Sequence, residues 1–163
     1  RWRVQFDDGD LVQRKMLQKG RLHHTSLRID GVKKHKLELL REILESREFE
    51  EATIIIFCRR RDTVMEVYSY LKQHFLGVMT CHGGMTQSFR SKSIKALKEG
   101  KAEILVATDI AARGLDVPAV THVVNYELPL VLDEFVHRVG RTGRIGRSGT
   151  TVTLVTGREK IFG

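Results

Sequence analysis

The stretch ILVATDIAARGLDVP, residues 104–118, joins a short apolar run to a polar loop that contains glycine and aspartate. An apolar run bounded by turn residues, as at 104–107, is typical of a strand that is buried on both faces. The stretch VMTCHGGMTQSFR, residues 78–90, has the same order, with paired glycines in its loop. Both stretches therefore predict a buried strand that leads into a polar loop at the edge of a sheet.

Outward from these two stretches, further apolar runs alternate with segments of helical period. We expect strands at residues 22–29, 53–57, 78–81, 104–107, 122–125 and 151–155. Between the strands, apolar residues recur at helical spacing, as in Leu37, Leu40 and Leu44. This alternation predicts an α/β fold, a mostly parallel sheet of about six strands with helices on both faces.

The length and composition suit one compact domain with a polyanionic partner. The chain has 163 residues, of which 41% are hydrophobic, and we expect one domain over residues 21–163. Residues 1–20 are expected to form a linker or N-terminal extension. Lys and Arg number 28 against 20 Asp and Glu, which gives a net charge of +8. This charge favours nucleic acid. A membrane surface also attracts cations, but the sequence has no basic amphipathic helix or long apolar run, so we expect no membrane partner.

The two cysteines indicate a reducing environment. Cys58 and Cys81 form no CxxC pair, and no His or Cys ligands stand around them at zinc spacing. Each ends an apolar run, which is typical of a reduced thiol at the end of a strand. The chain opens with RWRVQF, without the apolar core of a secretory signal. We therefore expect an intracellular protein without a metal site of its own, in a compartment that the sequence leaves open.

An arginine and glycine repeat, HRVGRTGRIGRSG at residues 137–149, gives the sharpest functional signal. Arginines stand at every third position (Arg138, Arg141, Arg144 and Arg147). On a helix such arginines would share a face and repel one another, and each interior glycine would cost about 1 kcal/mol relative to alanine. We interpret the repeat as a site for an external anion with several oxygens, since the guanidinium fork matches phosphate.

Each polar residue in the other loops has two interpretations, one as a ligand and one as an ordinary structural or surface residue. Gln87 and Arg90 lie three apart on a predicted helix, so both face one nucleic acid strand or both are plain surface. Asp116 is either an acceptor for a ribose hydroxyl or a loop cap, and Thr108 is either a ligand or a helix N-cap. His137 alone would be a satisfied histidine. Their joint occurrence, in order, at strand ends of one sheet favours the functional readings.

Four segments of the chain resemble motifs of the DEAD-box RNA helicases of superfamily 2. HRVGRTGRIGR resembles motif VI, ATDIAARGLDV motif V, HGGMTQSFR the motif IVa region and IIIFCRR motif IV. The resemblance covers roughly residues 21–160 and is to the second of the two RecA-like domains of that family. It implies a RecA-like three-layer sandwich, a monomer, and RNA and the N-terminal RecA-like domain of the same protein as partners.

The resemblance also implies a role for each matching residue. Arg141 and Arg144 resemble the arginines that reach the ATP phosphates, with Arg144 as the arginine finger. Gly114 and Asp116 resemble the turn and the ribose contact of the nucleotide site, and His137 resembles an interdomain link. The RNA backbone ligands are then expected at Gly84, Gln87, Arg90 and Thr108, which would make binding insensitive to base sequence.

Two departures from the family pattern affect these expectations. Motif IV usually carries a polar pair such as Asn-Thr, whereas this chain has Arg59, Arg60 and Arg61. Arg60 takes the usual Thr position, where it either contacts the same phosphate by charge or points away as surface. Gly84 stands where the family often has Asp, so a backbone amide contact is expected to survive while any side-chain role is lost.

An ATPase of this kind also needs a GxxxxGK[ST] loop for the phosphates and acidic ligands for Mg²⁺. Neither is present in the sequence; Gly100-Lys101 is followed by Ala102 and lacks the upstream glycine. We therefore expect half of an ATP site, with Mg²⁺ held mainly by the other RecA-like domain. The alternative is a stand-alone, non-catalytic RNA-binding module derived from such a helicase. The retained Arg141, Arg144 and Asp116 favour the enzyme.

Overall fold

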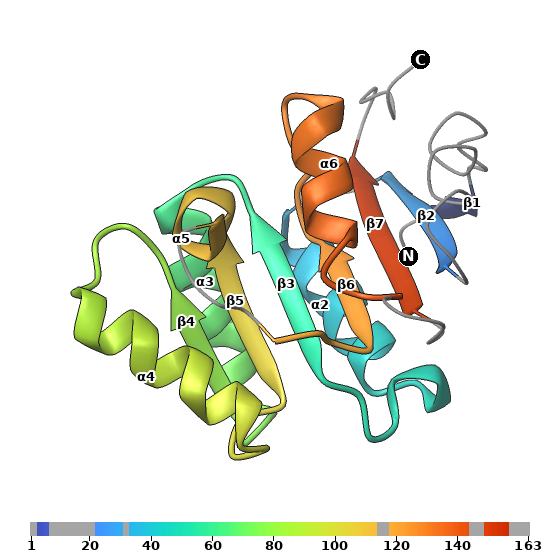
Figure 1. Cartoon of the computed structure of the whole chain (residues 1–163). Coiled ribbons are helices and arrows are strands. Elements are labelled where there is room, and N and C mark those ends of the chain that lie inside the picture. Colours follow the sequence, from blue (N-terminus) through green and yellow to red (C-terminus); the bar gives the residue numbers. More distant parts are fainter. Residues whose placement is uncertain (1–2, 7–21, 31–32, 114–117, 144–148, 157–163) are drawn as a thin grey trace.

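The fold is described from a computed structural model, for residues 3–6, 22–30, 33–113, 118–143 and 149–156. A single sheet runs through the molecule with helices packed on both sides (Figure 1). The elements are, in chain order, β1 (Arg3–Phe6), β2 (Leu22–Asp30), α2 (Lys33–Leu44), the 3-10 helix η1 (Arg47–Phe49), β3 (Ile54–Cys58), α3 (Arg61–Lys72), β4 (Val78–Cys81), α4 (Gln87–Lys98), β5 (Ile104–Thr108), α5 (Asp109–Arg113), β6 (His122–Asn125), α6 (Leu132–Val139) and β7 (Gly149–Thr156).

The strand order is β1-β2-β7-β6-β3-β5-β4. All neighbours from β2 to β4 pair in parallel, and β1 pairs antiparallel with β2 at the edge. The predicted α/β fold with a mostly parallel sheet is confirmed, and each of the six expected strands is present within two residues of its expected bounds. The seventh strand, β1, lies in the segment that we expected to be a linker or extension.

The helices cover the sheet because each turns an apolar stripe towards it. On one face, α2 and α3 bury Leu40, Val67 and Leu71 against the strands. On the other face, α4 and α5 bury Ile94, Leu97 and Ala111. The central strands β3 and β5 are buried at every position, as expected of parallel strands that are covered on both sides. The helical stripes of the sequence are therefore core.

From β3 the chain moves outward to β4 at one edge of the sheet, and it then returns through β5 to β6 and β7 on the other side of β3. In a parallel sheet the carboxyl ends of such strands frame the place where ligands bind. The segments that follow β3, β4, β5 and β6 all leave the sheet at this edge (Figure 1). The polar loops of the sequence are thereby brought together.

Candidate functional site

An open groove of about 360 Å³ lies at the carboxyl ends of β3, β4 and β5. Its lining residues are Arg59, Arg61, Gly83, Gly84, Thr108, Asp109, Ile110, Leu130 and Glu134. Four loops supply these residues, so the groove exists only because the strand order brings the loops together. Of the residues predicted from sequence, the groove takes in Gly84 and Thr108.

Arg59 is held in the wall of the groove by Glu127, which follows β6. The backbone N–H of Arg59 donates to Oε1 of Glu127 at 3.0 Å, and its Nη2 lies 3.5 Å from Oε2. This double link fixes the β3–α3 loop to the neighbouring strand. The charge of Arg59 is therefore already paired within the protein.

Arg61, the first residue of α3, lies against the glycine pair of the β4–α4 loop. A Cβ built on Gly84 would stand 2.6 Å from Nη1 and 2.9 Å from Cδ of Arg61. The backbone N–H of Gly84 donates to Nδ1 of His82 at 3.1 Å. Burial, and secondarily the charge of Arg61, hold the pKa of His82 below its usual 6.5. Nδ1 of His82 thus accepts a hydrogen bond as the unprotonated nitrogen of a neutral ring.

Gln87 and Arg90 lie on the first turn of α4, next to this loop. Thr86 caps the helix, since its Oγ1 accepts from the N–H of Phe89 at 3.2 Å. Gln87 is exposed and Arg90 is half-buried. Among the described residues, Nε of Arg90 is buried with no hydrogen-bond partner. Neither residue belongs to the lining of the groove, so the structure sets them beside it.

Arg60 also stays outside the lining of the groove, although both of its neighbours belong to it. It is the N-cap residue of α3, with extended backbone and an exposed side chain. Thr108 ends β5 and is buried, with its neighbour Asp109 also in the wall.

The repeat at residues 137–149 is not one helix, and its two described arginines, Arg138 and Arg141, differ in burial. The helix α6 ends at Val139, and Gly143 has a positive φ of 68° in the turn that follows. Gly149 packs so closely that an added Cβ would overlap the backbone nitrogen of Gly143. These two glycines are therefore explained by the fold itself.

Arg138 corrects the expectation of an external anion most directly, because its side chain is only 1% exposed. Nε donates to Oδ1 of Asp109 at 2.6 Å, and Nη2 donates to Oδ2 at 2.7 Å. Nη1 donates to the carbonyl of Glu127 at 2.5 Å and to Oδ1 of Asn125 at 3.3 Å. The anion of Arg138 is thus the chain's own carboxylate. Sequence reasoning missed this pairing.

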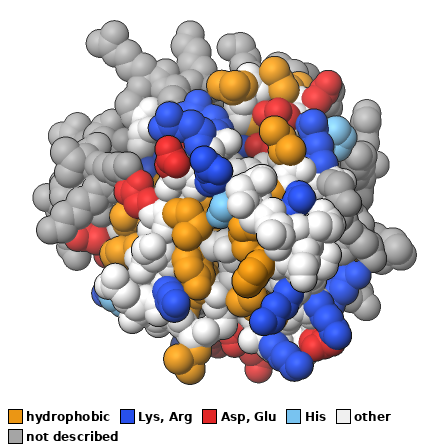
Figure 2. Space-filling model, turned by 90° about the vertical axis from the view of Figure 1, so that its left-hand side faces the viewer, with side chains coloured by type: hydrophobic (Ala, Val, Ile, Leu, Met, Phe, Trp, Pro, Cys, Tyr) orange, Lys and Arg blue, Asp and Glu red, His pale blue; other side chains and the backbone are white. Residues whose placement is uncertain are grey.

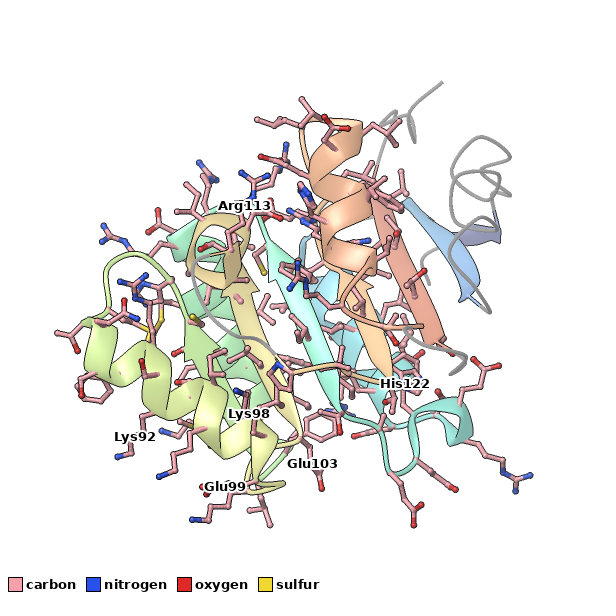
Figure 3. The ribbon with its side chains drawn as sticks, in the orientation of Figure 1. Lys92, Lys98, Glu99, Glu103, Arg113 and His122 are labelled. Atoms are coloured by element: carbon pink, nitrogen blue, oxygen red, sulfur yellow. The ribbon has the colours of Figure 1, made fainter. Side chains whose placement is uncertain are left out.

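Arg141 and His137 lie at a second, much smaller pocket of about 20 Å³, which Asp109, Ala112, Arg113, Arg138 and Phe57 also line. Arg141 is half-buried, and its Nε donates to the carbonyl of His137 at 3.3 Å. Arg113 lies at this edge of the molecule, whereas Glu99, Glu103 and His122 lie at the opposite edge (Figure 3). Asp109 borders both the groove and this pocket. The predicted residues Gly114, Asp116 and Arg144 lie outside the described residues.

On the side of the molecule formed by β4 and α4, Lys and Arg side chains gather in two areas (Figure 2). On α4 and the turn after it, four lysines are exposed: Lys92, Lys95, Lys98 and Lys101. Glu99 pairs with Lys101 at 3.1 Å and lies 3.8 Å from Lys95.

Within the described ranges, no three His, Cys, Asp or Glu side chains are grouped to hold a metal ion. None of the described helices is both long and apolar enough to span a bilayer.

The family model described as the helicase conserved C-terminal domain matches residues 35–146. Among curated proteins, the chain is 44% identical over 125 residues to ATP-dependent RNA helicase DeaD of Escherichia coli (strain K12). It is 38% identical over 143 residues to ATP-dependent RNA helicase SrmB of the same organism. The alignments cover 77% and 86% of this chain, but only 20% and 31% of the relatives. The chain thus spans a third or less of these two proteins.

Two solved structures show the same fold. E. coli DEAD-box protein SrmB, bound to regulator of ribonuclease activity A, superposes with a TM-score of 0.72 at 40% identity. That match covers 85% of this chain and 78% of that one. S. cerevisiae Dbp5 bound to RNA and ADP BeF3 superposes with a TM-score of 0.69 at 30% identity, over 86% of this chain and 36% of that one.

Proposed function

This chain belongs to the helicase conserved C-terminal domain family, in its DEAD-box branch. We propose that it is the C-terminal half of an ATP-dependent RNA helicase, and that it supplies arginines to ATP hydrolysis and one wall of an RNA groove. The observation that carries the proposal is the position of Asp109, which borders both the groove and the pocket with Arg141. A ligand in either place therefore contacts the same segment at the end of β5.

The RNA strand lies along the groove and the start of α4. Thr108 offers a hydroxyl, and Gln87 and Arg90 offer an amide and a guanidinium from the first turn of α4. Gly84 contributes to the same wall. The hydroxyl, the amide and the guanidinium suit sugar and phosphate oxygens, so binding is insensitive to base sequence and strongly dependent on salt. Because Arg60 is outside the groove lining, we assign it to the surface.

ATP binds at the Arg141 side, between this domain and an N-terminal RecA-like domain. A pocket of about 20 Å³ is far smaller than a nucleotide, so it fits one side of a shared site. In this proposal Arg141 and Arg144 reach the phosphates, Gly114 and Asp116 serve the ribose, and His137 links the two domains. Mg²⁺, held mainly by the other domain, neutralises phosphate charge during transfer.

The two sites act together when the domains close. ATP and RNA each bridge the two RecA-like domains, and closure brings Arg141 and Arg144 onto the phosphates. The same movement presses the groove against the bound strand and bends that strand out of duplex geometry. Remodelling of RNA duplexes follows from this coupling.

The test compares RNA-stimulated ATP turnover by this chain alone and by the protein with both RecA-like domains. We expect no measurable turnover by the chain alone, because the phosphate loop and magnesium ligands are on the other domain. Turnover by the chain alone at a rate typical of the two-domain protein would refute the shared site. The alternative, a non-catalytic RNA-binding module, predicts instead that RNA affinity does not respond to nucleotide in either protein.

A further inference from the structure

We propose that Arg61 is a ligand for an RNA backbone phosphate, and that Gly84 serves the groove by leaving the space in which Arg61 lies. The inference rests on the proposed function, since it names the group that holds the strand in the groove described above. It links the two departures of this chain from its family, the arginine run at residues 59–61 and the glycine at position 84.

The arginine run offers three cations, and the structure distinguishes them. Arg59 and Arg61 line the groove, while Arg60 does not. Arg59 is paired with Glu127 through its side chain and its backbone. Arg61 is exposed, and within the described part of the chain it makes no hydrogen bond or ion pair. Arg61 is therefore the cation of the run that combines a place in the groove with an unused charge.

Gly84 is needed for space rather than for backbone conformation. Among the described residues, positive φ angles occur at Glu51, Gly100 and Gly143, so Gly84 has a backbone that other residues adopt. A methyl group at Gly84 would instead meet the guanidinium of Arg61 at 2.6 Å. That group ends a flexible side chain, whereas the ring atom Cε1 of His82 lies farther away, at 3.2 Å, so we expect the methyl group to displace Arg61 first.

The backbone of Gly84 is already engaged. Its N–H donates to Nδ1 of His82 at 3.1 Å, so this amide is not directed at a ligand. From the sequence we expected the backbone amide of Gly84 to contact RNA. In this proposal the guanidinium of Arg61, which lies against Gly84, makes that contact instead. A guanidinium offers two parallel N–H donors, which match two oxygens of one phosphate. Thr108, in the same groove, supplies a hydroxyl for a neighbouring oxygen.

The experiment measures the affinity for a labelled single-stranded oligo(U) RNA at several salt concentrations, in the protein with both RecA-like domains. We expect Arg61→Ala to lower the affinity roughly tenfold at low salt and to reduce the salt slope by about 0.7, the value of one phosphate contact on a single strand. Arg47→Ala removes the same charge in η1, away from the groove, and is the matched control. Its slope should equal that of the unmodified protein.

Gly84→Ala separates the role of the space from the role of the charge. We expect it to weaken RNA binding when Arg61 is present and to add nothing in the Arg61→Ala background. Gly83→Ala adds the same methyl group to the same turn, where it would meet nothing within 4 Å beyond its two chain neighbours, and should weaken binding less than Gly84→Ala. Affinity for ATP without RNA should be unchanged by Arg61→Ala.

Two results would overturn the assignment of Arg61. One is an unchanged salt slope in Arg61→Ala while the unmodified protein binds RNA. The other is an equal loss from Gly84→Ala with and without Arg61, which would show that the glycine acts through its own backbone. If the unmodified protein shows no salt-dependent RNA binding at all, the proposed function fails together with this inference.

Discussion

Arg138 and Asp109 form a bidentate ion pair inside the domain, with Nε to Oδ1 at 2.6 Å and Nη2 to Oδ2 at 2.7 Å. The pair joins α6 to the start of α5, where β5 ends. Asp109 borders both the groove and the Arg141 pocket, and Arg138 borders the pocket, so this ion pair lies where the two proposed sites adjoin. Asn125 extends it to β7, since its Nδ2 donates to Oγ1 of Thr153 at 3.1 Å.

Removal of Arg138 should strongly destabilise the domain. Arg138→Ala leaves Asp109, Asn125 and the carbonyl of Glu127 without their donor, and breaking a buried pair in this way costs about 3–5 kcal/mol. Arg138→Lys should recover only part of this loss, because an ammonium cannot bond both oxygens of Asp109 in the same plane. Denaturant unfolding measures the difference in free energy.

Arg113→Ala is the control for that measurement, since Arg113 is exposed at the end of α5 and its loss should change stability by about 0.5 kcal/mol or less. An Arg138→Ala protein as stable as this control would mean that the buried pair contributes nothing to folding.

The order of apolar runs and helical stripes was sufficient to predict the sheet, because each run is bounded by turn residues and is long enough for one buried strand. The segment that holds β1 was predicted to be a linker or extension, because its own sequence does not specify that it pairs with β2. Arg138 was misassigned for a similar reason. Its partner Asp109 is 29 residues away, and equal spacing in the repeat concealed that α6 ends between Arg138 and Arg141.

Arg144 is expected to act on ATP hydrolysis rather than on RNA binding. In the protein with both RecA-like domains, Arg144→Ala should abolish RNA-stimulated turnover, since an arginine finger typically contributes on the order of 10³ to 10⁵ in rate. Arg144→Lys should rescue little, because a point charge cannot reproduce the planar fork. Turnover and nucleotide-free RNA affinity are measured for the same variants. Near-normal turnover with a collapse of RNA affinity would assign Arg144 to the groove instead.

His82 should titrate below pH 6.5 and should report on the position of Arg61. Burial lowers its pKa first, and the charge of Arg61 lowers it further. The unfolded chain therefore takes up the proton first, so the contribution of His82 to stability is present above about pH 6.5 and is lost as the pH falls. An NMR titration should show the midpoint of His82 rising in Arg61→Ala and staying in place in Arg47→Ala. An unmoved midpoint in Arg61→Ala would show that Arg61 does not lie beside this loop in solution.

Loss of the Glu134 charge should strengthen RNA binding, whereas loss of the Arg61 charge should weaken it. It is half-buried in the wall of the groove, where its charge opposes a polyanion, whereas the charge of Asp109 in the same wall is paired with Arg138. Glu134→Gln keeps the shape of the side chain and removes this repulsion, so we expect RNA affinity to rise about two- to fivefold at low salt. Because salt screens the repulsion, the gain in affinity should shrink as the salt concentration rises.

Glu103→Gln removes the same charge at the opposite edge of the molecule (Figure 3) and should leave the affinity near that of the unmodified protein. A loss of affinity in Glu134→Gln would mean that this carboxylate accepts a hydrogen bond from the strand, for which a ribose 2′-hydroxyl is the fitting donor.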